Sequence, residues 1–235
     1  MASISVDEPR VKRQPLPAQV ASILARRIAR GEFADGAAPS ESDVAKEFGV
    51  SRVVAREALK ALETLDVVTI TQGRRFLVRP ATQWDYLSPR LAEWLPPDQA
   101  EGLLRDLSDV RLLLEPELAA RAASAADEKA VQRLRGLVDS MAELEEDPEA
   151  YLVADLEFHA EICNASGNRL LERFMYSCRW LLTAGRRVTN QTPSAIPDGT
   201  KMHREICAAI GDRDPKRARE AMRAHLESAP WLAER

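Results

Sequence analysis

The sequence predicts a mainly α-helical chain in two parts: three helices with a β-hairpin, then an all-α antiparallel helical bundle. Apolar residues recur at helical spacing over most of the chain, whereas alternation at period two stands out only around residues 67–79. The 235 residues are also enough for two separate cores. We therefore expect one domain at 1–80, a linker with a short helix at 81–97, and a helical domain at 98–235.

The composition is typical of a soluble globular protein, with 45% hydrophobic and 30% charged residues. No apolar run is long enough to cross a bilayer, and the polar N-terminus lacks a signal-peptide core, so we expect a cytoplasmic protein. Cys163, Cys178 and Cys207 form no CxxC pair, which indicates reduced thiols. Residues 1–80 carry 13 Lys and Arg against 10 Asp and Glu, and the remainder 20 against 27. Only the N-terminal part therefore has a basic bias, +3 against −7.

Two helices are expected at the start of the N-terminal part. Apolar residues at helical spacing from Leu16 to Ile28 predict the first, and Gly31 ends it. For the second helix, Ser40 is the candidate N-cap, Asp43 follows three residues later, and Gly49 is the C-terminal stop.

The segment Ser51 to Leu65 predicts a third helix with two unlike faces. Ser51 is placed to cap it, Arg52, Arg56 and Lys60 stack on one side, and apolar residues line another. A helix pair of this kind, with arginines near the start of the second helix, is the arrangement that lies in a DNA major groove. An ordinary core helix with a solvated basic side has the same pattern.

Beyond the third helix the period changes from helical to alternating. The letters VVTIT, QGR and RFLVR predict a strand, a tight turn and a second strand. Three helices followed by a hairpin is the order of a winged helix-turn-helix domain, whose wing tip, here Gly73, Arg74 and Arg75, lies beside DNA. Basic residues at both projecting points favour DNA binding over a hairpin whose arginines only aid solubility.

The stretch PSESDVAKEFGVSRVVAREALKALETLDVV closely resembles the N-terminal domain of GntR-family bacterial transcription regulators. The residues that match the family's spaced pattern are Pro39, Ser40, Glu41, Val44, Ala45, Val50, Ser51, Arg52, Arg56, Glu57, Ala58 and Leu59. The resemblance implies that Arg52 and Arg56 contact bases and phosphates, and that Ser40, Glu41 and Ser42 lie close to DNA. The wing departs from the family's Gly-Arg-Gly-Thr-Phe-Val, because Arg75 stands in place of the second glycine.

The segment ATQWDYLSPRLAEWLPP predicts a linker whose tryptophans anchor a short helix on the second domain. Apolar periodicity after residue 98 then predicts a bundle. A long first helix is expected to bury Leu103, Leu107, Val110, Leu114 and Leu118, with a kink at Pro116. The next helix is expected to bury Val131, Leu134, Val138 and Met141, and four more follow at roughly 149–165, 168–190, 199–210 and 215–232, with a loop from Thr192 to Asp198.

All three histidines of the chain lie on apolar helical stripes. Asp155 and His159 are four residues apart on one stripe, while His203 and His225 lie on two later ones. A carboxylate on an inward face is costly unless it is paired or coordinated. A lone histidine on such a face is usually a satisfied core residue, but three on three helices, with an aspartate beside the first, favour a metal site.

These segments resemble the all-helical FCD effector domain of the FadR branch of GntR regulators. The resemblance implies Asp155, His159, His203 and His225 as the metal ligands. Such a set suits a borderline divalent ion, with zinc as the first choice and nickel or manganese as alternatives.

The resemblance also implies an acidic effector that Arg111 contacts, within an Arg-x-x-x-Glu pattern completed by Glu115. By themselves, Arg111 and Glu115 fit an intrahelical ion pair equally well. A later helix, which carries Arg186, Arg187 and Asn190, is also expected to reach the cavity that holds the effector.

We therefore expect a homodimeric repressor that an organic acid, bound over the metal, releases from operator DNA. The linker QWDYLSPRLAEW resembles the Trp-x-x-Leu … Trp segment of galactonate-type regulators, which implies an aldonic or uronic sugar acid. A metal-dependent enzyme using the Asp and His set is one alternative, although no spare Glu or His is placed as a general base. A DNA-binding protein with a purely structural metal is the other.

Overall fold

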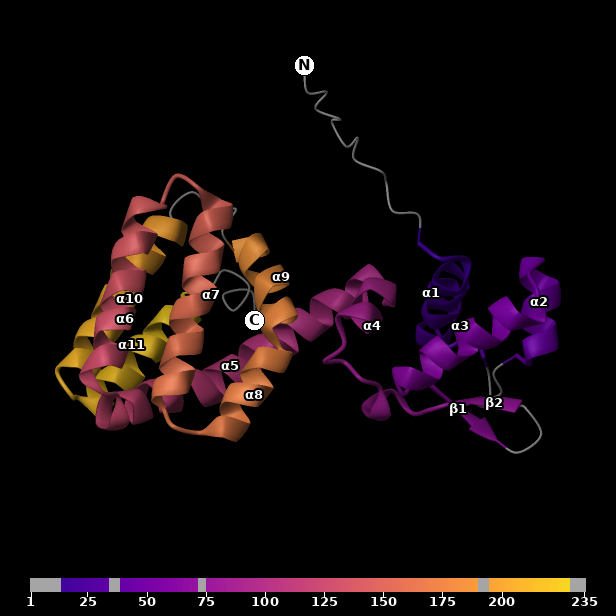
Figure 1. Ribbon diagram of the computed structural model, residues 1–235, viewed down its shortest axis with the longest axis horizontal. Helices are drawn as coiled ribbons and strands as arrows, with labels where there is room; N and C mark the ends of the chain where they lie inside the picture. Colours follow the sequence, from indigo (N-terminus) through magenta and orange to yellow (C-terminus); the bar gives the residue numbers. More distant parts are fainter. Residues whose placement is uncertain (1–13, 34–38, 72–74, 190–194, 229–235) are drawn as a thin grey trace, which may run out of the picture. The chain divides into compact units, whose positions relative to one another are not determined.

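The computed structural model describes residues 14–33, 39–71, 75–189 and 195–228 (Figure 1). The chain divides into two compact units, Met1–Pro96 and Pro97–Arg235. Both are mainly helical, which confirms the predicted fold class. Among the described residues, no helix combines the length and the apolarity needed to cross a bilayer.

The first unit has the winged helix-turn-helix order. Its elements are α1 (Leu16–Ala29), α2 (Glu41–Phe48), α3 (Arg52–Thr64), β1 (Val68–Thr71), β2 (Arg75–Val78), the 3₁₀ turn η2 (Ala81–Gln83) and α4 (Pro89–Trp94). The strands are antiparallel, with Val68 opposite Val78 and Thr71 opposite Arg75. Leu24 of α1, Leu59 and Leu62 of α3 and Phe76 of β2 are buried in one core.

Local signals set the junction between α2 and α3. Ser40 and Asp43 form a complete capping box at the start of α2, and Gly49 ends that helix in the left-handed conformation, at φ 62°. The Ser51 hydroxyl then accepts the Val54 backbone N–H at the start of α3. Gly49 and the Ser51 cap therefore fix the turn that joins α2 to α3.

The segment after the wing packs on the first unit. Trp84, Leu91 and Trp94 are buried in the same core as α1 and α3, and α4 contacts α1. This corrects the expectation that the tryptophans anchor the segment on the second domain. The spacing of the aromatic residues predicted burial, but it did not identify the surface that covers them.

The second unit is a helical bundle. Its helices are α5 (Pro97–Ala125), α6 (Glu128–Glu143), α7 (Pro148–Ala165), α8 (Arg169–Ser177), α9 (Arg179–Thr189), α10 (Ala195–Gly211) and α11 (Pro215–Glu227). The long helix α5 contacts α7, α9, α10 and α11 (Figure 1). Asp127, Asp147, Asn168 and Asp214 cap α6, α7, α8 and α11 with side-chain oxygens. The core includes Leu134, Phe158, Ile162, Ile206 and Met222.

Two segments of the bundle differ in helical structure from the prediction. The expected helix at 168–190 is two helices, α8 and α9, which meet at the buried Cys178 without a glycine or proline to mark the break. The expected loop at 192–198 is partly helical, because α10 begins at Ala195. Pro197 is compatible with this start, since backbone N–H groups in a first turn have no intrahelical acceptor.

Candidate metal centre and DNA-binding surface

Three helices of the second unit bring four potential metal ligands together. Asp155 and His159 occupy successive turns of α7, His203 lies on α10 and His225 on α11. All four are buried, and one potential ligand atom from each lies within 4.8 Å of the others. Because α7, α10 and α11 all contact α5, the bundle fixes the group from several sides.

The polar atoms of this group have few partners within the protein. His203 Nε2 lies 3.2 Å and His159 Nε2 3.9 Å from Asp155 Oδ1. Among the described residues, neither contact has hydrogen-bond geometry, and His203 Nδ1 and His225 Nδ1 also lack a partner. Buried polar atoms are nearly always hydrogen-bonded, so a cluster of this kind calls for an explanation. A bound cation is one, since nitrogen and oxygen lone pairs facing one point form a ligand set.

One nitrogen of His159 is held from outside the group. Its Nδ1 lies 2.5 Å from Glu115 Oε2, and Glu115 Oε1 accepts a 2.6 Å hydrogen bond from Arg111 Nε. A neutral imidazole that donates through Nδ1 presents its lone pair at Nε2, which faces the group. The carboxylate thereby sets both the tautomer and the orientation of the ring.

The electrostatics of the centre favour a carboxylate beside neutral imidazoles. Burial opposes ionisation of Asp155, but the positive charge of Arg186 acts in the opposite direction, and the pKa of Asp155 lies well below its usual range. Burial lowers the pKa of His159 to about 4, although Glu115 acts in the opposite direction. Burial, with the charge of neighbouring groups, also lowers the pKa of His225. Neutral imidazole and carboxylate are the forms that bind metals.

The predicted effector residues fall into three groups. Arg111 and Glu115 are buried next to the histidines, and Arg186 forms a buried ion pair with Asp155. Arg187, by contrast, pairs with Glu149 through two hydrogen bonds of 3.1 and 2.9 Å at the exposed surface. Asn190 lies outside the described residues.

Two contacts near the centre were not predicted from the sequence. One is the Glu115–His159 pair, which joins α5 to α7. The other involves Tyr151, one turn before Asp155, whose hydroxyl donates a 3.3 Å hydrogen bond to the Ile196 carbonyl of α10. Burial raises the pKa of Tyr151 to about 12, so the phenol is neutral. Its position one turn before Asp155 was the only available signal.

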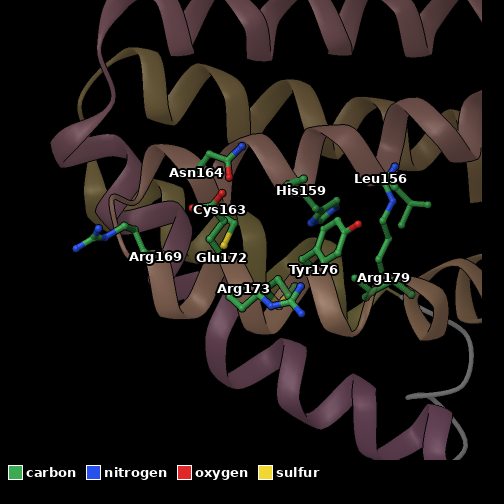
Figure 2. A pocket seen from close by; sticks show the side chains of 12 residues that line it. Leu156, His159, Cys163, Asn164, Arg169, Glu172, Arg173, Tyr176 and Arg179 are labelled. Carbon is green, nitrogen blue, oxygen red and sulfur yellow. The ribbon is translucent and has the colours of Figure 1, made fainter. Parts of the chain in front are cut away.

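A cavity of about 570 Å³ lies beside the centre, between α7, α8 and α9 (Figure 2). Leu156, Cys163 and Leu182 are among its buried lining residues. Figure 2 shows the side chains of His159 and Tyr176 between those of Arg169 and Arg179, which lie towards opposite sides of the view. The His159 ring therefore forms part of both the histidine cluster and the wall of this cavity.

The first unit presents the predicted cationic stripe. Arg52, Arg56 and Lys60 are exposed on α3, opposite the buried Ala55, Ala58, Leu59 and Leu62. Glu41 accepts hydrogen bonds from Arg56 Nε and Nη2 at 3.0 and 3.1 Å.

The other predicted DNA contacts are described only in part. Ser40 and Ser51 cap their helices, and Ser42 is exposed. Gly73 and Arg74 lie outside the described residues. Arg75 begins β2, but its side chain lies outside the description.

Each of the two units matches the model of a known protein family. Residues 16–78 match the model of bacterial regulatory proteins of the gntR family, and residues 106–228 match that of the FCD domain. The chain belongs to the FadR-like branch of the gntR family. It is therefore a transcription regulator rather than an enzyme, which confirms the resemblance seen in the sequence.

Two relatives and one solved structure match almost the whole regulator. The galactonate operon transcriptional repressor of Escherichia coli is 26% identical over 88% of this chain and 91% of its own. The transcriptional repressor NanR of Klebsiella aerogenes is 31% identical over 94% of this chain and 87% of its own. A GntR structure from Streptococcus agalactiae is 27% identical, covers 90% of this chain and 97% of its own, and has a TM-score of 0.51.

Proposed function

We propose that this regulator is a cytoplasmic, homodimeric repressor whose operator affinity depends on a small organic acid bound over a divalent metal. Asp155, His159, His203 and His225 would hold the ion, with zinc as the first choice and nickel or manganese as alternatives. The observation that supports this proposal most strongly is the buried group of potential ligand atoms within 4.8 Å of one another. Several of these atoms lack hydrogen-bond partners among the described residues. A cation would satisfy these atoms, whereas an empty centre would leave the cost of their desolvation.

The acid would bind beside the metal. A metal with more than four coordination positions would accept carboxylate or hydroxyl oxygens in addition to the four protein ligands. Arg111 would provide a further contact, because its buried Nη2 has no hydrogen-bond partner among the described residues and a guanidinium favours carboxylates. Arg186 and Asn190 would complete the effector site together with Glu115. The name of the Escherichia coli relative supports a sugar acid as the effector.

DNA would be bound by the first unit of each subunit. Arg52, Arg56 and Lys60 would face the major groove and its phosphates, with Ser40, Ser42 and Ser51 at the adjoining helix starts. Gly73, Arg74 and Arg75 of the wing would lie beside the backbone. In a dimer, two such helices must meet grooves about one helical turn apart or a multiple of it. The acid would change operator affinity because it binds better to a dimer with one spacing between its two DNA-binding units than to a dimer with another. The names of both relatives support repression.

A ligand screen tests this proposal directly. Thermal unfolding of the metal-loaded protein would be followed with sugar acids and with small carboxylates, each with and without a chelator. We expect at least one acid to raise the melting temperature only in metal-loaded protein, since a ligand that binds the native state stabilises it by mass action. Stabilisation that persists after metal removal would contradict binding over the metal.

The same screen separates the proposal from a purely structural metal. A structural ion predicts that the chelator lowers the melting temperature and that no acid changes it. Operator binding that responds to none of the stabilising acids would likewise refute effector control.

A further inference from the structure

Glu41 and Arg56 form a two-point ion pair at the surface predicted to face DNA. Both oxygens of the carboxylate are used, on Nε and Nη2 along one edge of the guanidinium. The pair joins the first residue of α2 to the second turn of α3. The Glu41 side chain is 14% exposed and that of Arg56 46%, so the carboxylate is shielded while the arginine stays accessible.

An acidic residue at this surface requires an explanation. The phosphate backbone repels a carboxylate, and positive charge supplies most non-specific affinity for DNA. Glu41 therefore weakens the electrostatic attraction to DNA, and a second role is needed to offset this cost. Its two-point contact restricts Arg56 to one orientation, and a guanidinium held along one edge keeps the N–H groups at its outer end available.

We infer that Glu41 is a positioning residue that aims Arg56 at a guanine in the major groove. The outer edge of a guanidinium matches the O6 and N7 acceptors of guanine, the commonest specific contact between arginine and a base. An arginine free to rotate would exchange this contact for a nearby phosphate. Glu41 thus increases base selectivity at the expense of charge. This inference rests on the proposed DNA binding of the first unit.

Neighbouring residues offer a contrast. In the part of the chain that the structure describes, Lys60 makes only a single ion-pair contact, 3.7 Å long, with Glu57 on its own helix. Single-point contacts of this kind leave a side chain free to follow phosphates. Arg56 is the residue of the cationic stripe that another helix holds at two points. Base selectivity is therefore expected to concentrate at the position that Arg56 reads.

The test is selection of DNA from a randomised library by the full-length protein. Wild type is expected to prefer guanine at one position of each half-site by about 10- to 100-fold. Glu41→Gln should lose most of that preference while selection at other positions is unchanged. In an Arg56→Lys background, Glu41→Gln should have no further effect at that position. Glu47→Gln is the matched control, because it makes the same substitution on α2 and removes a 2.7 Å contact with Arg27.

Failure of the positioning role and failure of the proposed DNA binding give different results. If wild type selects no sequence, the proposed DNA binding itself fails. If wild type selects an operator and Glu41→Gln only strengthens binding to all sequences alike, Glu41 acts through charge alone and the positioning role is wrong. Equal loss of selectivity in Glu47→Gln would show a general effect of damage to α2, and would also overturn the inference.

Discussion

Glu115 Oε2 lies 2.5 Å from His159 Nδ1, and this contact joins α5 to the helix that carries two of the potential metal ligands. Arg111 holds the other oxygen of the same carboxylate. Arginine, carboxylate and imidazole therefore form a continuous chain from the proposed effector contact to the proposed metal ligand. These three side chains therefore connect the proposed effector site to the proposed metal centre.

We predict that Glu115→Gln lowers metal affinity by about 10- to 100-fold, the usual cost of losing the partner of a ligating histidine. The reason is that an amide holds the ring less firmly and does not favour the Nδ1–H tautomer as a carboxylate does. Competition with a chromogenic chelator measures the affinity. Glu117→Gln is the control, since Glu117 pairs with Arg219 at the exposed face of the same helix. Equal metal affinities in Glu115→Gln and wild type would show that Glu115 has no role in metal binding.

Asp155→Ala and His203→Ala are each expected to lower the metal content of purified protein. Each removes a ligand from a set of four and leaves fewer than a structural site normally uses. Elemental analysis measures the stoichiometry. Asp198→Ala, which changes an exposed residue of α10 that pairs with Lys201, should retain the metal. Unchanged stoichiometry in both ligand variants would place any metal elsewhere.

Arg111→Ala is expected to weaken the response of operator binding to organic acids while binding without acid persists. It should also lower the free energy of unfolding by about 3–5 kcal/mol, because it leaves the buried Glu115 carboxylate without its cation. Urea denaturation measures the stability, and Arg219→Ala supplies a surface ion pair for comparison. An unaltered dose response in folded Arg111→Ala would reduce Arg111 to a structural ion pair.

Arg56→Ala is expected to abolish operator binding and to leave both metal content and acid binding intact. The residue lies in the first unit, whereas the predicted ligands belong to the second. Fluorescence anisotropy with labelled operator measures the loss. Retained operator affinity would show that α3 does not carry the recognition.

Structural features that depend on residues close together in the sequence were the most predictable. Ser40, Asp43 and Gly49 fixed both ends of α2, because caps depend on residues only a few positions apart. The inward placement of Asp155 and the three histidines followed from helical periodicity for the same reason.

Features set by tertiary contact were not predictable in this way. The partner of His159 is 44 residues distant, and the sequence identified Glu115 as an ion-pair partner of Arg111 and as an effector residue, but not as the residue that holds His159. The junction at Cys178 has no helix-breaking residue, and the burial of Trp84 and Trp94 did not identify the unit that covers them. Periodicity shows which face of a helix is buried, but it does not show which partner meets that face.

One titration tests whether an acid controls operator binding through the metal centre. Operator affinity of metal-loaded wild type and of Asp155→Ala would be measured against increasing concentrations of an acid that stabilises the wild type. We expect the operator affinity of the wild type to fall as acid is added, and Asp155→Ala to bind the operator without responding to the acid. The same dose response in both proteins would contradict this expectation.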